Sequence, residues 1–201
     1  MRLLALLLLA GLLAACAAPA ASPPALGVTA QQQAVLASAG QLRDGDLVFR
    51  RGRDLMSSLV LRQGRHSRFS HVGMVLREGG QVLVVHAMPD EPGSPGGVRL
   101  EPLEQFLAPA LASDAASYRL PGVQADALRP WLLAQQGKPF DMRFALSDAS
   151  TLYCTELVMR GLEVAGVAVE PATVRAPLVA EPVIPPDALR DLPGLLPLAG
   201  A

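Results

Sequence analysis

Residues 71–88 have the sequence HVGMVLREGGQVLVVHAM, two apolar runs joined by a pair of glycines. The runs His71–Leu76 and Val82–Ala87 have the length and the β-branched content of strands. Gly79 and Gly80 between them are typical of a two-residue hairpin turn, because such turns need positive φ angles. The sequence therefore predicts an antiparallel hairpin, around which the rest of the fold is organised.

A two-residue turn also fixes which residues of the two strands face each other. It pairs Glu78 with Gln81, Leu76 with Leu83, Gly73 with His86 and His71 with Met88. Alternation then places His71 and His86 on one face as diagonal neighbours, about 7 to 8 Å apart in the backbone, and Gly73 leaves space beside them. The opposite face is wholly apolar and is expected to pack on helices: Val72, Met74, Leu76, Leu83, Val85 and Ala87.

The segment 150–166 predicts a helix that carries the second cysteine. Its apolar residues recur on roughly one helical face: Leu152, Leu157, Val158, Leu162 and Ala165. Ser150 or Thr151 is suited to cap the start of this helix, and Gly166 is suited to cap its end. Cys154 is then in the first turn, where free N–H groups and the helix dipole favour a thiolate over a thiol.

These residues suggest a nucleophilic site. Cys154 is the candidate nucleophile, and His71 is the candidate base that holds the thiolate and later protonates the leaving amine. His86 is the candidate third group, which orients the imidazole of the base. Backbone N–H groups at the helix start are placed to stabilise an oxyanion. Each residue also has a plainer interpretation: Cys154 as a small buried hydrophobe, and either histidine as a surface or core residue.

The first residues are typical of an export signal. Arg2 is followed by an apolar run, Leu3–Leu13, and then by two alanines and Cys16. The segment LAAC at 13–16 resembles the lipobox of bacterial lipoproteins, whose cysteine is lipid-modified and becomes the first residue of the mature chain. A transmembrane anchor is the alternative, but Pro19 and the prolines after it interrupt the apolar stretch at about the minimum spanning length.

The chain divides into four parts on this basis. We expect a signal peptide over 1–15, a lipidated Ala/Pro-rich tether over 16–29, a folded domain over 30–170 and a Pro-rich C-terminal extension over 171–201 without regular structure. Within the domain we expect further helices at 31–39, 53–63, from Leu103 onward and at 125–136. Further strands are expected at 47–49, 98–100 and 117–120.

Composition limits the classes of function. The chain has 201 residues, 51% of them hydrophobic, which is enough for a sizeable core. Its formal net charge is -1 and it has no basic stripe, which argues against nucleic-acid binding. There are 2 cysteines, so a lipidated Cys16 leaves Cys154 without a disulfide partner in an oxidising compartment.

Four segments, in this order, resemble a known family: GDLVF at 45–49, SHVG at 70–73, GKPFD at 137–141 and YCTELV at 153–158. They resemble the circularly permuted papain-like amidases, the YiiX/YebB-like branch of the NlpC-type cysteine hydrolases, over about Asp44 to Gly166. The resemblance implies an α+β fold, an antiparallel sheet packed against helices, in which the histidine strand precedes the cysteine helix. It also implies Cys154 as nucleophile, His71 as base and His86 as the third polar residue, where relatives often have an acidic residue.

The first functional hypothesis is therefore a cysteine hydrolase that cleaves an amide through an acyl-enzyme, without a cofactor. Cell-wall peptides are the natural substrates if the enzyme is anchored by its lipid on the periplasmic face of the outer membrane, which Ala17 after Cys16 favours over the inner membrane. A variant with the same chemistry acts on lipid acyl groups, either as a deacylase or as an acyltransferase.

Two further classes remain as alternatives. A zinc site made by His71, His86 and Cys154 is one, although the chain has no Cys-x-x-Cys or His-x-x-x-His cluster. The other is a non-catalytic binding lipoprotein on the same scaffold. A missing nucleophile or base would have favoured this alternative, and both residues are present.

Overall fold

The computed structural model describes residues 26–64, 66–91, 93–177 and 179–201. Within these residues, one antiparallel sheet of six strands has the order β4-β3-β2-β1-β5-β6. The strands are β1 (Leu47–Gly52), β2 (His71–Glu78), β3 (Gln81–Met88), β4 (Gly97–Pro102), β5 (Ala112–Arg119) and β6 (Leu196–Ala199). The predicted hairpin is β2 and β3, and it lies inside the sheet.

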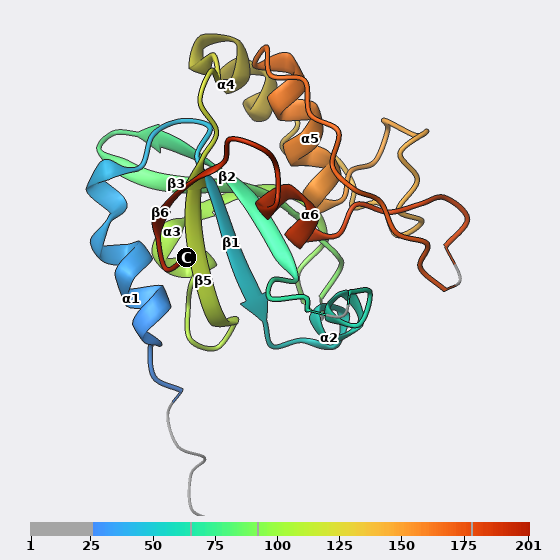
Figure 1. Cartoon of the computed structure of the whole chain (residues 1–201), viewed down its shortest axis with the longest axis horizontal. Helices are drawn as coiled ribbons and strands as arrows, with labels where there is room; N and C mark the ends of the chain where they lie inside the picture. The colour runs from blue at the N-terminus through green and yellow to red at the C-terminus, as the bar shows by residue number, and fades with distance from the viewer. Residues whose placement is uncertain (1–25, 65, 92, 178) are drawn as a thin grey trace, which may run out of the picture.

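Helices lie on both sides of the sheet (Figure 1). They are α1 (Ala30–Ala37), α2 (Leu55–Leu61), α3 (Leu103–Phe106), α4 (Ala125–Ala134), α5 (Cys154–Val164) and α6 (Pro186–Arg190), with a short 3-10 helix over Ala39–Gln41. Figure 1 shows α4 and α5 together on one side and α1 on the other. The α+β class expected from the resemblance is confirmed, and each further helix and strand that the sequence predicts overlaps an observed one.

The two faces of the hairpin enter two separate core clusters. Val72 and Met74 pack with Leu157 and Leu162 of α5, in a cluster that also contains Leu128 of α4. On the other face, the second cluster holds the following residues of the sheet, α1 and α3: Val75, Val84, Val35 and Phe106. The apolar face predicted to pack on helices therefore does so, and the histidine-bearing face is covered as well.

The hairpin register agrees with the prediction near the turn. Glu78 pairs with Gln81 and Leu76 with Leu83, and both turn glycines have positive φ, 55° and 86°. The ladder between β2 and β3 ends at Met74 and Val85, so the two outer pairs predicted for Gly73 and His71 are not formed. Since β2 still pairs with β1, and β3 with β4, the sheet divides between β2 and β3 at the end that carries the histidines.

The prediction that residues after Glu170 have no regular structure is wrong. β6 pairs with β5 at the edge of the sheet, and Ile184, Leu189 and Leu192 are buried in the same core cluster as the hairpin. In addition, Asp187 of α6 accepts hydrogen bonds from the backbone N–H groups of Arg68 and Phe69, just before β2. The segment lacks a clear hydrophobic period because its structure depends on pairing with, and packing against, distant residues.

The predicted signal peptide, the lipid-modified Cys16 and most of the tether lie outside the described residues. Residues 26–29, the last of the tether, have no regular structure. Among the residues that the structure describes, no helix is long and apolar enough to cross a membrane.

Candidate active site

Cys154 is the first residue of α5, as predicted, but the helix is not capped as predicted. The N-cap is Tyr153, whose side chain makes no capping hydrogen bond. Ser150 and Thr151 lie before the helix because the next residue, Leu152, is held extended by a bridge to Phe140. Gly166 does end the helix with a φ of 82°, as expected.

The thiol of Cys154 lies among backbone donors but is also desolvated. Burial raises the pKa of the Cys154 thiol to about 11, whereas the N–H groups of Val72, Thr155 and Cys154 itself lower it. The N–H of Val72 lies beyond the end of the β2–β3 ladder. The expectation of a lowered thiol pKa is therefore wrong, because burial outweighs the helix start.

The two predicted histidines meet on one face of the hairpin. Nε2 of His71 lies 2.8 Å from Nδ1 of His86, with the rings at 75° to each other. Both rings also pack against Phe106 of α3, with centroids 5.6 Å and 5.0 Å away. Gly73 is needed for this arrangement, because a Cβ there would stand 3.1 Å from the Cβ of His86.

A carboxylate that the sequence did not reveal completes the set. Glu101 of β4 is buried, and its Oε1 lies 2.9 Å from Nε2 of His86. Arg50 and Arg99 flank the same carboxylate at 4.0 Å and 3.8 Å. No sequence motif indicated Glu101. Its approach to His86 depends on the register between β3 and β4, in which His86 pairs with Arg99. An irregular loop separates these two strands in the sequence.

Both imidazoles are neutral at physiological pH. Burial, with the charge of Arg50, holds the pKa of His71 well below its usual range. Burial also lowers the pKa of His86 to about 4, against the opposing effect of Glu101. Burial acts to raise the pKa of Glu101, but the contact with His86 and the positive charges of Arg99 and Arg50 outweigh it, and the net shift is downward.

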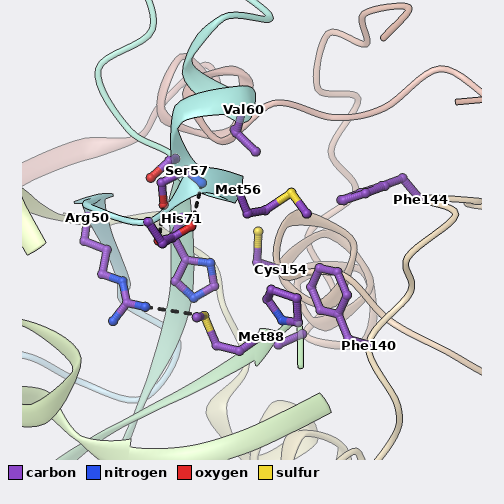
Figure 2. A pocket seen from close by; sticks show the side chains of 13 residues that line it. Arg50, Met56, Ser57, Val60, His71, Met88, Phe140, Phe144 and Cys154 are labelled. Atoms are coloured by element: carbon purple, nitrogen blue, oxygen red, sulfur yellow. Dashed lines mark hydrogen bonds between the residues drawn. The ribbon is translucent and has the colours of Figure 1, made fainter. Parts of the chain in front are cut away.

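His71 and Cys154 both line one small cavity of about 40 Å³, shown in Figure 2. Arg50, Asp54, Ser57 and Ser70 supply its other polar groups. The remaining lining is apolar and comes from α2, the end of β3 and the loop before α5: Met56, Val60, Ala87, Met88, Pro89, Phe140 and Phe144. The structure thus brings the proposed nucleophile and base to one cavity and places His86 behind the base.

A second cavity, of about 20 Å³, lies on another side of Cys154 and is also mainly apolar. Val60 and Phe144 belong to both cavities. Phe144 has a φ of 53°, which is uncommon for a residue with a side chain. Its loop is fixed by Asp141, whose carboxylate accepts hydrogen bonds from the N–H groups of Arg143 and Ala145.

A cysteine at the start of a buried helix, facing a histidine on an antiparallel sheet, defines a papain-like cysteine hydrolase. The histidine strand comes first in the chain, which makes the arrangement a permuted one. The chain belongs to the family of permuted papain-like amidase enzymes, YaeF/YiiX, C92 family, which matches residues 41–187. It is therefore a cysteine peptidase or amidase by family.

A solved structure has the same fold. The chain is similar to the crystal structure of metalloprotein yiiX from Escherichia coli O157:H7, with a TM-score of 0.66 and 24% identity. The similarity covers 80% of this chain and 98% of the other. A search of the curated proteins finds no match.

Proposed function

We propose that this protein is a lipid-anchored cysteine amidase that cleaves its substrate through an acyl-enzyme on Cys154. The observation that carries the proposal is the shared cavity, which Cys154 and His71 both line. Nδ1 of His86 forms a hydrogen bond with Nε2 of His71. The neutral state of the thiol and the imidazole defines the first step. His71 takes the thiol proton as sulfur attacks the carbonyl carbon of the amide.

The remaining steps use groups at the same site. N–H groups at the start of α5, and that of Val72, are placed near the thiol and so near the oxyanion that forms. The imidazolium of His71 then gives its proton to the leaving group, the amine of an amide or the alcohol of a lipid ester, and the acyl group stays on sulfur as a thioester. Water, deprotonated by His71, releases the acid and restores the thiol.

Two substrates are proposed, each on a different ground. Cell-wall peptides follow from the expected location of a lipid-anchored enzyme in the bacterial envelope. Lipid acyl groups are favoured by the lining of both cavities, where Met56, Phe140 and Val183 are examples of a largely apolar surface. An apolar acyl chain gains from burial against such side chains, whereas the charged groups of a peptide stem would lose hydration there.

The experiment is a substrate panel. The purified full chain is incubated with a muropeptide digest and, separately, with phospholipids, and products are identified by mass spectrometry. Hydrolysis products from either incubation that are absent with Cys154→Ala support the proposal. The incubation that yields these products identifies the substrate class. No product from either, or the same products with Cys154→Ala, argues for a binding protein instead.

The anchor is proposed from the sequence alone. Cys16 is expected to carry the lipid, and Ala17 is expected to permit transfer to the outer membrane. Mass spectrometry of membrane fractions tests this: an acylated N-terminal cysteine supports the anchor, and an unmodified chain in the soluble periplasm refutes it. Cys16→Ser should release the protein while leaving hydrolysis by the purified chain intact.

A metal-dependent reaction does not fit these residues, although the related structure is titled a metalloprotein. His86 faces His71 with Nδ1 and Glu101 with Nε2, so neither of its nitrogens is free to share a metal with Cys154. No group of three or more His, Cys, Asp or Glu residues in the described part of the chain could hold a metal ion. The zinc alternative is therefore not supported, and no step is assigned to a metal.

A further inference from the structure

We infer that Glu101 is a positioning residue that acts through His86 to hold His71 in the tautomer whose Nδ1 is free to accept the thiol proton. This inference rests on the proposed role of His71 as the base. Glu101 does not line the cavity that His71 and Cys154 share, and it contacts His86, so its effect passes through His86.

The tautomer of each imidazole follows from the charge on Glu101. An ionised carboxylate can only accept, so Nε2 of His86 must carry the hydrogen that faces Glu101. His86 is neutral, so its Nδ1 has a lone pair and accepts from Nε2–H of His71. Nδ1 of His71, the remaining nitrogen, is then unprotonated and available to the thiol.

The surroundings keep the carboxylate ionised and in place. Arg50 and Arg99 flank Glu101 within 4.0 Å. Arg50 is itself fixed, because it donates to the carbonyl of Phe106 at 2.7 Å and stacks over that ring at 4.5 Å. A protonated Glu101 could instead donate to His86 and reverse both tautomers. The two arginines therefore favour the tautomers in which Nε2 of each imidazole carries the hydrogen.

The His86–Glu101 contact is a short ion-pair contact and does not meet the geometry of a hydrogen bond. Nε2 of His86 and Oε1 of Glu101 are both buried, and neither has a well-aligned hydrogen bond within the described part of the chain. The two atoms lie 2.9 Å apart, so each is a close polar neighbour of the other. Replacing Glu101 removes this close contact with a negative charge from the buried Nε2 of His86 and leaves the His86 ring free to change tautomer.

Nitrogen-15 NMR of the full chain tests the tautomers directly, without a substrate. The wild type is expected to show His71 and His86 both protonated at Nε2 and not at Nδ1. Glu101→Gln replaces a carboxylate, which can only accept a hydrogen from His86, by an amide, which can also donate one. The spectrum of this variant should therefore show mixed tautomers, while Glu101→Asp should retain the wild-type pattern. The matched control is Glu104→Gln, on an exposed residue of α3, which should change nothing.

Turnover of the substrate found in the panel gives the second readout. Glu101→Gln should lower kcat about 10- to 100-fold, the scale known for groups that orient metal-binding histidines, with KM within about twofold of the control. A wild-type spectrum with His71 protonated at Nδ1, or Glu101→Gln with unchanged tautomers and kcat, would overturn the inference. Full activity of Cys154→Ala would instead overturn the proposed function, so the two failures are distinguishable.

Discussion

Nε2 of His71 and Nδ1 of His86 lie 2.8 Å apart at the end of the hairpin where β2 and β3 separate. This contact leaves one nitrogen of His71 for the reaction and commits the other to His86. The two histidines therefore differ in role although they lie on one face.

Their replacement should show this difference. His71→Ala removes the proton acceptor and should lower kcat/KM by about 10²- to 10⁴-fold. His86→Ala removes only orientation and should cost less. Steady-state kinetics of both variants, with the exposed His66→Ala as control, checks the order, and a larger loss for His86→Ala would make His86 the base.

The buried histidines should make the protein less stable in acid. Their folded-state pKa values are lowered, so the unfolded chain binds protons first and stability is lost as pH falls from about 6.5 through the folded pKa. His86, with a folded pKa of about 4, should alone cost about 3 kcal/mol over that range. Urea unfolding at pH 7 and pH 4 measures this loss.

The exposed His66 provides the control for that measurement. His66→Asn should retain the whole pH dependence of the free energy of unfolding. A free energy that stays constant between pH 7 and pH 4 would show that folding does not lower the pKa values of the two imidazoles.

The thiol should react with a small alkylating reagent only as the pH becomes alkaline. Burial raises the pKa of Cys154 to about 11, and the groups that lower it are backbone N–H groups and Arg50. The rate of alkylation by iodoacetamide, followed by intact mass, should therefore rise through pH 9 and 10. His71→Ala should leave this profile in place while it strongly lowers hydrolysis, whereas a plateau below pH 7 would indicate a resting ion pair.

Much of the fold could be predicted from local patterns. The glycine turn and the alternation of residues 71–88 were sufficient to predict the hairpin and to bring His71 and His86 together. The helical period around Leu157 and Leu162 was sufficient to place Cys154 in a first turn. These features depend on residues close in sequence, which is why they were found.

The features that were missed depend on distant contacts. Glu101 reaches His86 only through the register of β4, which follows a loop rich in proline and glycine. The raised pKa of Cys154 depends on how deeply α5 is packed, and β6 exists because β5 offers it a free edge. None of these leaves a periodic signal in the sequence.

Gly73 offers a test of the packing beneath the site. A Cβ at this position would collide with Val84 and stand 2.9 Å from the carbonyl oxygen of Val85. Gly73→Ala should therefore destabilise the protein by about 1 to 3 kcal/mol and displace His86, so kcat should fall too. Gly40→Ala, where a Cβ meets nothing within 4 Å, is the matched control, and equal stability of the two variants would contradict this packing.

The central claim is that the sulfur of Cys154 is the nucleophile, and stoichiometric modification tests it most directly. In the full chain carrying Cys16→Ser, Cys154 is the only thiol, so alkylation can be counted by intact mass on the sample used to measure hydrolysis. The account predicts that activity falls in proportion to the modified fraction, and that Cys154→Ala is inactive while its thermal unfolding is cooperative. Hydrolysis that persists after complete modification of Cys154 would contradict it.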